Sequence, residues 1–276
     1  MLKQRIITAL ILAPIAIGGI FFLDPQRFAW FIGFVIVLGA WEWANLAGFE
    51  APVTRWGYAG LIALALFASG WLPMGLVLGL GGLWWVVALL LVVSYPASTN
   101  LWQAPFVRLV MGVCVLVPTW KALVFVRSAS LSAVPDLSNL WVILYIMLLV
   151  WGADVGAYFA GRAWGNKKLA PKVSPGKSWA GVYGGMVSIA IIGCVASALL
   201  SLPLVLAFKL VSISLLTGMF SVLGDLLESM LKRHRGIKDS SQLLPGHGGV
   251  LDRIDSLTAA IPVFTLILFV LGEFTA

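Results

Sequence analysis

Long uncharged runs dominate this chain, and short polar or Gly/Pro breaks separate them. A helix needs about 20 apolar residues to cross a hydrocarbon core of about 30 Å. The expected spans are residues 6–23, 28–46, 57–72, 75–94, 106–126, 138–160, 179–200, 204–228 and 256–273. The pattern therefore predicts an all-α polytopic integral membrane protein with about nine transmembrane helices.

Two of the breaks rest on glycine and proline because no charge marks them. No charged residue occurs between Arg55 and Arg108, a stretch too long for one crossing. Gly70–Pro73 divides it, and Ser201–Pro203 divides the later long run. The first run could be a signal peptide, but no small-residue cleavage site precedes Asp24, so we expect a retained span.

Composition supports the membrane assignment. The chain is 61% hydrophobic and 11% charged, with a mean hydropathy of +1.02, whereas a soluble protein carries roughly 25% charged residues. So few charges cannot cover a water-facing surface, so lipid must contact most of the exterior. Cys114 and Cys194 lie in apolar runs without CxxC spacing, so they indicate packing and no metal or disulfide.

The distribution of charge predicts the orientation. The net charge is +7, and most Lys and Arg fall in alternate loops, which would all be cytoplasmic if the N-terminus is inside. This asymmetry follows the positive-inside rule. We expect a cytoplasmic N-terminus and an outside C-terminus, and the basic charge then requires no nucleic acid partner.

Four acids in the C-terminal third are the strongest chemical signal. Asp225 and Glu228 are three residues apart near the end of the eighth expected span, and Asp252 and Asp255 have the same spacing at the start of the ninth. Each pair shares one helix face, and carboxylates near a membrane default to a functional role with a named partner. The alternative is a set of helix-end salt bridges with Lys232, Arg233 or Arg253. Carboxylates brought together need a cation, and phosphate chemistry favours Mg²⁺, with a second cation possible.

Two loops that carry these acids also hold phosphate-binding candidates. In SPGKSW, Ser174, Lys177 and Ser178 form an expected short turn with donors for phosphate. In LPGHGG, Gly248 and Gly249 free the backbone to approach an anion. His247 could be a metal ligand, a proton carrier or an orienting donor, and we favour the orienting donor. Further basic candidates are Lys232, Arg233 and Lys238. A Walker-type ATPase is excluded, since the GxxxxGK[ST] spacing is absent.

These features predict a metal-dependent phosphate site at the cytoplasmic membrane boundary, for a substrate that is part lipid and part water-soluble. The alternative from another class is a secondary transporter, whose ion pathway would be marked by Glu42, Lys121, Asp154 and Lys209. Against it, no inverted repeat is visible and the polar residues gather at one face.

The segment from Ser229 to Asp255 resembles the signature of the phosphatidate cytidylyltransferases (CDP-diacylglycerol synthases). It reads S-x2-K-R-x4-K-D-x-S-x2-L-P-x-H-G-G-x2-D-R-x-D without departure. The segments ADVGAYFAGR and SPGKSW also resemble that family. The resemblance is strong over residues 150–260, and before residue 135 it rests on hydropathy alone.

The resemblance implies that CTP and phosphatidate react to give CDP-diacylglycerol and pyrophosphate, with magnesium. It implies ion binding by Asp225 and Asp252, and catalytic roles for Lys177, His247 and Arg253. We expect Lys177 and His247 to line one cavity. The implied protein is a homodimer in the cell inner (plasma) membrane, with its active site facing the cytoplasm. Residues 1–135 would be a scaffold or lipid gate, and residues 136–276 would hold the catalytic site.

Overall fold

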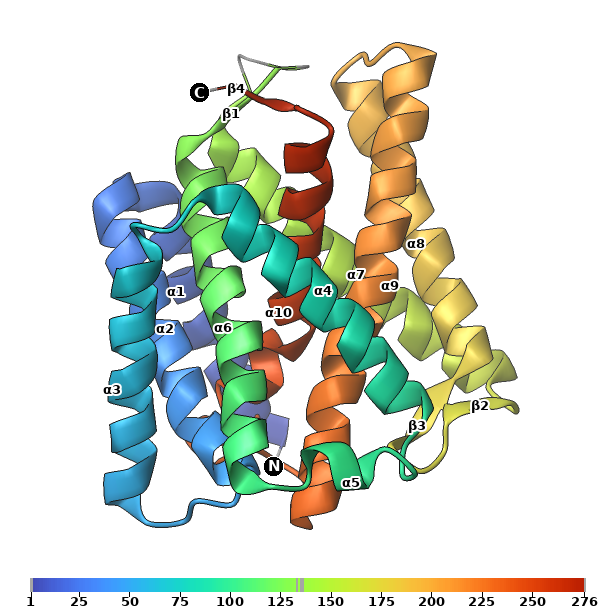
Figure 1. Ribbon diagram of the computed structural model, residues 1–276. Helices are drawn as coiled ribbons and strands as arrows, with labels where there is room; N and C mark the ends of the chain where they lie inside the picture. Colours follow the sequence, from blue (N-terminus) through green and yellow to red (C-terminus); the bar gives the residue numbers. More distant parts are fainter. Residues whose placement is uncertain (1, 133, 135–136, 276) are drawn as a thin grey trace.

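Helices make up most of the described part of the chain, which is residues 2–132, 134 and 137–275 of the computed structural model (Figure 1). The helices are α1 (Leu2–Phe22), α2 (Pro25–Leu46), α3 (Pro52–Ser69), α4 (Met74–Val93), α5 (Thr99–Trp102), α6 (Pro105–Ser128), α7 (Asn139–Trp164), α8 (Trp179–Leu199), α9 (Leu204–Arg235) and α10 (Leu251–Val270). The strands are β1 (Ser130–Leu131), β2 (Lys168–Ala170), β3 (Ser174–Ser178) and β4 (Phe274–Thr275). β1 pairs with β4, and β2 pairs with β3, both antiparallel.

Each long helix coincides with one of the nine apolar runs. Proline begins α2, α3 and α6, where its missing N–H costs no hydrogen bond. Asp24 caps α2 by accepting from the N–H groups of Gln26 and Arg27, and the Arg27 N–H lowers the pKa of the Asp24 carboxyl. Gly236 ends α9 with a φ of +77°, a conformation that favours glycine.

The described helices are those of a polytopic membrane protein. Seven of them, α2, α4, α6, α7, α8, α9 and α10, are long and apolar enough to cross a membrane. α9 is longer than its expected span, which ended at residue 228, because it continues to Arg235. Hydropathy detects only the lipid-facing part of a helix, and the basic last turns of α9 lie beyond it.

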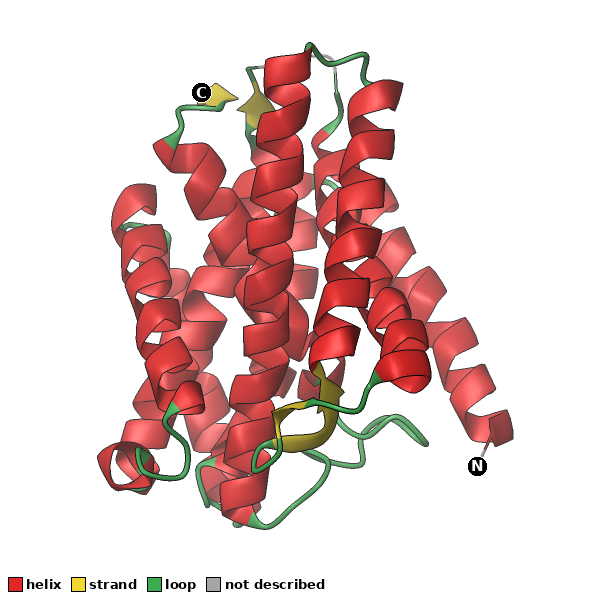
Figure 2. Ribbon diagram, turned by 90° about the vertical axis from the view of Figure 1, so that its right-hand side faces the viewer, coloured by secondary structure: helices red, strands yellow, loops and turns green. Residues whose placement is uncertain are grey.

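Helix α10 lies at the centre of the bundle (Figure 1), and Figure 2 shows the same bundle from the side, with short strands at its two ends. Of its apolar stretch, 56% is buried, more than in any of the other six. It packs against α9 and against α4 and α6, so helices from residues 1–135 and from residues 136–276 surround it together. Asp252 and Asp255 stand at the start of this central helix.

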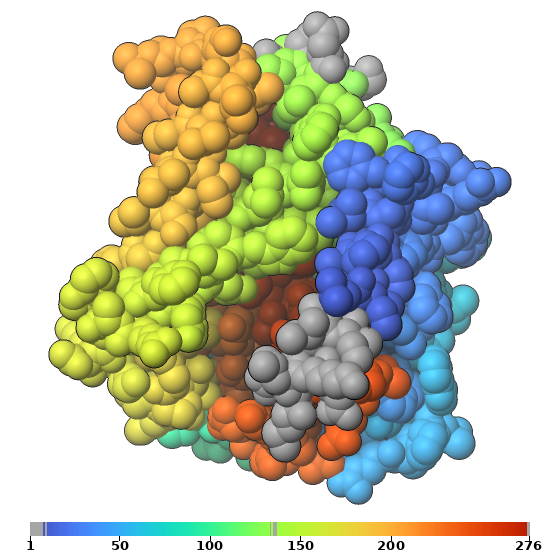
Figure 3. Space-filling view, turned by 180° about the vertical axis from the view of Figure 1, so that it is seen from behind, coloured from blue at the N-terminus to red at the C-terminus, as the bar shows by residue number. Residues whose placement is uncertain are grey.

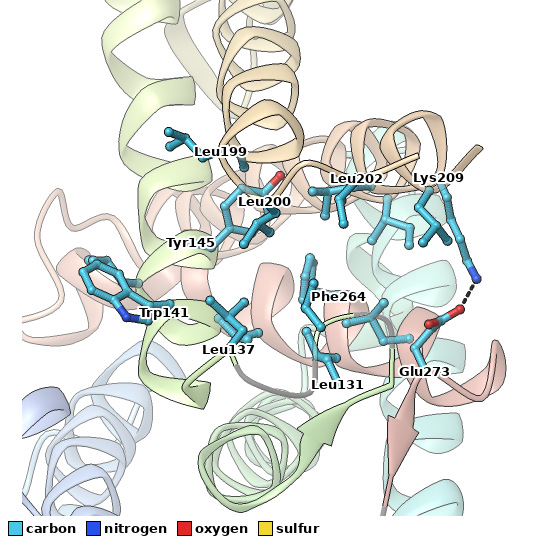
Figure 4. A pocket seen from close by; sticks show the side chains of 18 of the residues that line it. Leu131, Leu137, Trp141, Tyr145, Leu199, Leu200, Leu202, Lys209, Phe264 and Glu273 are labelled. Atoms are coloured by element: carbon cyan, nitrogen blue, oxygen red, sulfur yellow. Dashed lines mark hydrogen bonds and ion pairs between the residues drawn. The ribbon is translucent and has the colours of Figure 1, made fainter. Parts of the chain in front are cut away.

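The two ends of the bundle differ. The N-terminus lies at the end that carries β2 and β3, called the hairpin end below, and the C-terminus lies at the opposite end with β1 and β4 (Figure 1). An apolar cavity of about 400 Å³ lies at that opposite end, with Lys209 and Glu273 ion-paired at its margin (Figure 4). All four acids of the predicted site lie toward the hairpin end.

The short strands correct the all-α prediction in detail. SPGKSW was expected to form a turn, but Ser174–Ser178 is strand β3, with Lys168 opposite Ser178. The hydrophobic pattern could not reveal this, because the pair has no apolar face with alternating residues. The hairpin gives Lys177 a defined place in front of α8.

Candidate active site

A cavity of about 400 Å³ lies between α7, α8 and α9 near the hairpin end. Its lining includes the polar residues Asp154, Arg162, Lys177, Ser178, Asp225 and Ser256. Figure 3 shows a hollow on one face of the molecule between α7 and α1, with α9 and α10 at its floor. Lys177 of β3 and Asp225 of α9 therefore meet in this cavity, and none of the described residues of the LPGHGG loop belongs to its lining.

Lys177 and Asp225 form the ion pair of this cavity. Lys177 Nζ lies 2.7 Å from Asp225 Oδ2, and the two side chains are 26% and 29% exposed. Ser178 begins α8 by accepting a hydrogen bond from the Gly181 N–H at 3.2 Å, which orients the adjacent Lys177. The pair remains open enough for a ligand to exchange contacts with either group.

Close packing of α9 on α10 places the acids side by side. A Cβ at Gly224 would lie 2.5 Å from the Asp255 carbonyl oxygen and 3.2 Å from the Ala259 Cβ. Only a residue without a side chain permits this approach. Asp225, next to Gly224, is thereby brought to the same level as Asp255.

Lys232 holds the second group of charges. Its Nζ lies 2.7 Å from Asp252 Oδ1 and 3.3 Å from Glu228 Oε1. The side chains are 12% exposed for Lys232, 5% for Asp252 and 3% for Glu228. Lys232 was expected to bind phosphate, but here its ammonium neutralises two buried carboxylates.

Asp252 also orders the LPGHGG loop. Its Oδ2 accepts from the N–H groups of Ser240 at 2.9 Å and Gly249 at 2.7 Å, and from the Ser240 hydroxyl at 3.0 Å. Gly248 has a φ of +82°, and a Cβ there would lie 2.7 Å from Asp252 Oδ2. The Gly249 N–H, expected to bind an anion of the substrate, is thus engaged by Asp252.

Glu42 is a site-forming residue that the sequence analysis named only under the transporter alternative. It is 0% exposed on α2, and it accepts from the N–H groups of Val250 at 2.9 Å and Leu251 at 2.6 Å. It also accepts from the hydroxyls of Ser241 at 2.5 Å and Ser240 at 3.2 Å. Its partners lie 198 to 209 residues further along the chain, so no local spacing could reveal them.

The other predicted residues have varied surroundings. His247 lies outside the cavity lining, and its Nδ1 is buried without a hydrogen-bond partner among the described residues. Arg233 Nε donates to the Val173 carbonyl at 3.2 Å, which ties α9 to the β2–β3 hairpin. Lys238 and Arg253 are exposed, and Ser174 is half-buried opposite Ala170 in the hairpin.

Two cavity residues were absent from the predicted site, Asp154 and Arg162 on α7. The signal was present in ADVGAYFAGR, where Asp154, Tyr158 and Arg162 recur every four residues and so share one helix face. Tyr158 also lines the cavity, and its hydroxyl accepts from Arg162 Nη1 at 3.2 Å. These side chains give the cavity a polar wall opposite Lys177.

The charges that suggested a transporter have local roles. Lys121 donates to backbone carbonyls at the end of α3, where a cation is favourable. Lys209 pairs with Glu273 at the opposite end of the bundle, and Glu42 binds the start of α10. The four residues do not line one path, so the transporter interpretation is unsupported.

We expect Gly249→Ala to disrupt the loop, because an added Cβ would overlap the Ser240 Oγ and lie 2.7 Å from the Glu42 Cδ. A forced shift of this kind costs about 1–3 kcal/mol. Thermal unfolding of the purified variant measures the loss. Gly57→Ala is the control, since a Cβ there has open space within 4 Å, and equal unfolding temperatures for the two variants would contradict this view of the loop.

Comparisons with known proteins cover almost the whole chain. The model of the family described as the cytidylyltransferase family matches residues 3–271. A Pseudomonas aeruginosa protein named phosphatidate cytidylyltransferase is 51% identical over 274 residues, which is 99% of this chain and 98% of that protein. A Haemophilus influenzae protein with the same name is 41% identical over 98% of this chain and 99% of its own. One from Brucella suis is 34% identical over 96% of this chain and 92% of its own.

Proposed function

The chain belongs to the cytidylyltransferase family, and we propose on that premise that it transfers the cytidylyl group of CTP to phosphatidate. The products are CDP-diacylglycerol and pyrophosphate. One observation carries the proposal: two of the segments that resemble the family, ADVGAYFAGR and SPGKSW, line one cavity in which Lys177 faces Asp225. A cavity beside membrane-spanning helices suits a substrate with acyl chains in lipid and a phosphate in water.

The reaction joins two anions. An oxygen of the phosphatidate phosphate attacks the α-phosphorus of CTP, the bond between this phosphorus and the bridging oxygen breaks, and pyrophosphate leaves with that electron pair. The nucleophile is already ionised, so no general base is required. The protein has to orient the two phosphates in line and neutralise their charge.

Basic residues of the cavity are suited to that task. Lys177 and Arg162 come from different elements, so they can contact different phosphates. Lys177 would exchange part of its contact with Asp225 for an oxygen of the triphosphate. Arg253, Lys238 and Arg233 are exposed toward the same end of the bundle and would draw CTP to it by charge.

We propose magnesium as the cation of the four acids. Among the described residues, no three His, Cys, Asp or Glu side chains form a metal-binding group. Magnesium, however, is commonly held by one or two carboxylates together with substrate phosphates. Both oxygens of Glu228 are buried and make no hydrogen bond among the described residues, and Lys232 Nζ lies 3.3 Å from Oε1. We therefore propose Asp225, Asp252, Asp255 and Glu228 as candidate ligands. When bound, the ion would neutralise the charge of the converging phosphates, and a second cation could share the cluster.

For the setting of the enzyme, we propose nine spans with the hairpin end in the cytoplasm. The positive-inside distribution supports this orientation, and CTP is then available where the cavity lies. The enzyme would be a multi-pass protein of the cell inner membrane, and we propose that it acts as a homodimer. Lipid would reach the cavity sideways, through the hollow between α7 and α1 (Figure 3).

The direct test is CTP-dependent conversion of phosphatidate by the purified protein in detergent or vesicles. We expect radiolabelled CDP-diacylglycerol to form with magnesium, and its yield to fall when a chelator removes divalent cations. Absence of product with both substrates and magnesium present would refute the proposed reaction. Product formed at full rate in the chelator would refute the magnesium proposal alone.

We expect Lys177→Ala to lower kcat/KM about 100-fold, the usual loss when one preorganised donor to a transition-state anion is removed. Lys172→Ala is the matched control, because Lys172 is an exposed lysine of the same loop and contributes the same charge to topology. Steady-state kinetics with both substrates would measure the difference. Equal kinetic constants for the two variants would mean that Lys177 serves only membrane orientation.

A further inference from the structure

Glu42 is a buried carboxylate that lies far along the chain from the segment Ser229–Asp255. It lies in the last turns of α2, and its side chain reaches the start of α10 and the loop before it. Both oxygens are used: Oε1 accepts from Ser241 and Val250, and Oε2 accepts from Ser240 and Leu251.

The contacts explain why a charge is tolerated at a fully buried position. An isolated buried carboxylate is costly, and hydrogen-bond donors must replace its lost water. Two of the donors are N–H groups at the N-terminal end of α10, where the helix dipole favours a negative charge. Val250, the residue before α10, provides no side-chain cap. Glu42 therefore caps the N-terminus of α10 from another helix, a role that an Asp or Ser directly before the helix usually has.

Ser240 connects Glu42 to the predicted site. The Ser240 Oγ lies 3.2 Å from Glu42 Oε2 and 3.0 Å from Asp252 Oδ2. The Ser240 carbonyl accepts from Asn45 Nδ2 at 3.0 Å, one turn beyond Glu42 on α2. A Cβ at Gly249 would overlap the Ser240 hydroxyl and crowd Glu42, so glycine at this position allows the two carboxylates to share one serine.

The N-terminal helices hold this loop at more than one point. Thr8 of α1 donates to the Pro245 carbonyl at 2.8 Å, and Arg235 donates to the Asn45 carbonyl at 3.2 Å. Of these contacts, only that of Glu42 is made by a carboxylate. It is also the one that reaches the start of α10, the helix that presents Asp252 and Asp255. The Thr8 contact is a neutral link to the loop, and the Arg235 contact joins the end of α9 to α2.

We propose that Glu42 is a positioning residue for cytidylyl transfer: it fixes the first turn of α10 and, through Ser240, the orientation of Asp252. The inference rests on the proposed function. The N-terminal helices would then help to position Asp252, a role different from that of a scaffold or a lipid gate. Asp252 lies 2.7 Å from Lys232. A change in the position of Glu42 would therefore also affect the buried group formed by Asp252, Lys232 and Glu228.

Glu42→Gln is the primary test variant. Its NH₂ group would face N–H and O–H donors and could not accept from them, so the α10 start would lose about half of its support. We expect kcat to fall roughly 10- to 100-fold, as for partners that orient a site from behind. KM for CTP and for phosphatidate should change little, since the residue does not line the cavity. Ser241→Ala removes one donor and keeps the carboxylate, so it is a milder variant that should lose less.

Glu50→Gln is the matched control. Glu50 lies just beyond α2 and pairs with Arg235, but its side chain is 77% exposed. This variant removes the same charge near the same end of the bundle. We expect its kcat and its unfolding temperature to equal those of the wild type within error.

The decisive measurement is a double-mutant cycle between Glu42→Gln and Ser240→Ala, with kcat measured for the monodisperse fraction of each protein. If Glu42 acts through Ser240, the double variant should lose clearly less than the product of the single losses. A role of Glu42 that does not run through Ser240 would give losses that multiply in full, and that result would overturn the inference. Equal kcat for Glu42→Gln and Glu50→Gln would overturn it as well.

Hydrogen exchange separates failure of this inference from failure of the proposed function. In Glu42→Gln, amides of residues 249–252 should exchange faster than in the wild type and in Glu50→Gln. Unchanged exchange there would overturn the positioning role even if activity fell. A wild-type protein with no transfer activity would instead refute the proposed function, and with it the role in catalysis.

Discussion

Replacing Asp225 with asparagine is expected to lower kcat several hundred-fold while the protein still folds and inserts. Asn has nearly the same shape, and its amide oxygen can still accept from the Ser229 hydroxyl, now 3.1 Å from Asp225 Oδ1. The negative charge that faces Lys177 at 2.7 Å disappears. If that charge also binds magnesium, one ligand and part of the transition-state stabilisation are lost, about 3–4 kcal/mol.

The measurement is initial rate against magnesium concentration for the wild type, Asp225→Asn and a control, Asp24→Asn. Asp24 lies at the start of α2 and is exposed, and asparagine caps a helix as well as aspartate does. The control should keep wild-type kinetics. Near-normal activity of Asp225→Asn at saturating magnesium would rule out its assignment as a metal ligand.

The helices were largely predictable, because crossing a membrane demands long apolar runs and the sequence shows them. Each of the nine runs coincides with a long helix. The runs could not define helix ends outside lipid: α9 continues to Arg235, where polar residues remain helical. The β2–β3 hairpin was also missed, since its strands are short and polar and follow no apolar alternation.

The candidate site was only partly predictable for a similar reason. Spacings of three along a helix indicate which acids share a face, but they do not indicate which cation lies opposite. The chain gives Asp225 and Asp252 separate partners, Lys177 for the first and Lys232 for the second. The sequence leaves two roles open for Lys232, phosphate binding and a helix-end salt bridge, because the spacing of the charges does not decide between them.

Glu42 shows the limit of local sequence more sharply. The sequence suggests a role for this acid only under the transporter alternative, because its hydrogen-bond donors are not in its own segment. Only the packing of α2 beside α10 brings Val250 and Leu251 to it. A buried charged residue whose hydrogen-bond donors are backbone N–H groups far along the chain is recognised only in a three-dimensional structure.

Replacing Lys232 with methionine is expected to cause the largest loss of stability. Methionine keeps most of the length of lysine but removes the charge that lies 2.7 Å from Asp252 and 3.3 Å from Glu228. Both carboxylates are at most 5% exposed, so water cannot replace the ammonium. Removal of one partner from a buried ion pair costs about 3–5 kcal/mol, and we expect a decrease of that size in the free energy of unfolding.

Unfolding of the purified proteins by denaturant in detergent micelles would measure this loss. Lys209→Met is the control: Lys209 pairs with one acid, Glu273, and the side chains are 32% and 17% exposed, so its loss should be near 1 kcal/mol. The variant Lys232→Met/Glu228→Gln should recover part of the stability, because it also removes a carboxylate left without its cation. If Lys232→Met and Lys209→Met lost equal stability, or if Glu228→Gln gave no recovery, Lys232 would not be neutralising a buried acidic group. The other role predicted for Lys232, phosphate binding, would then gain support.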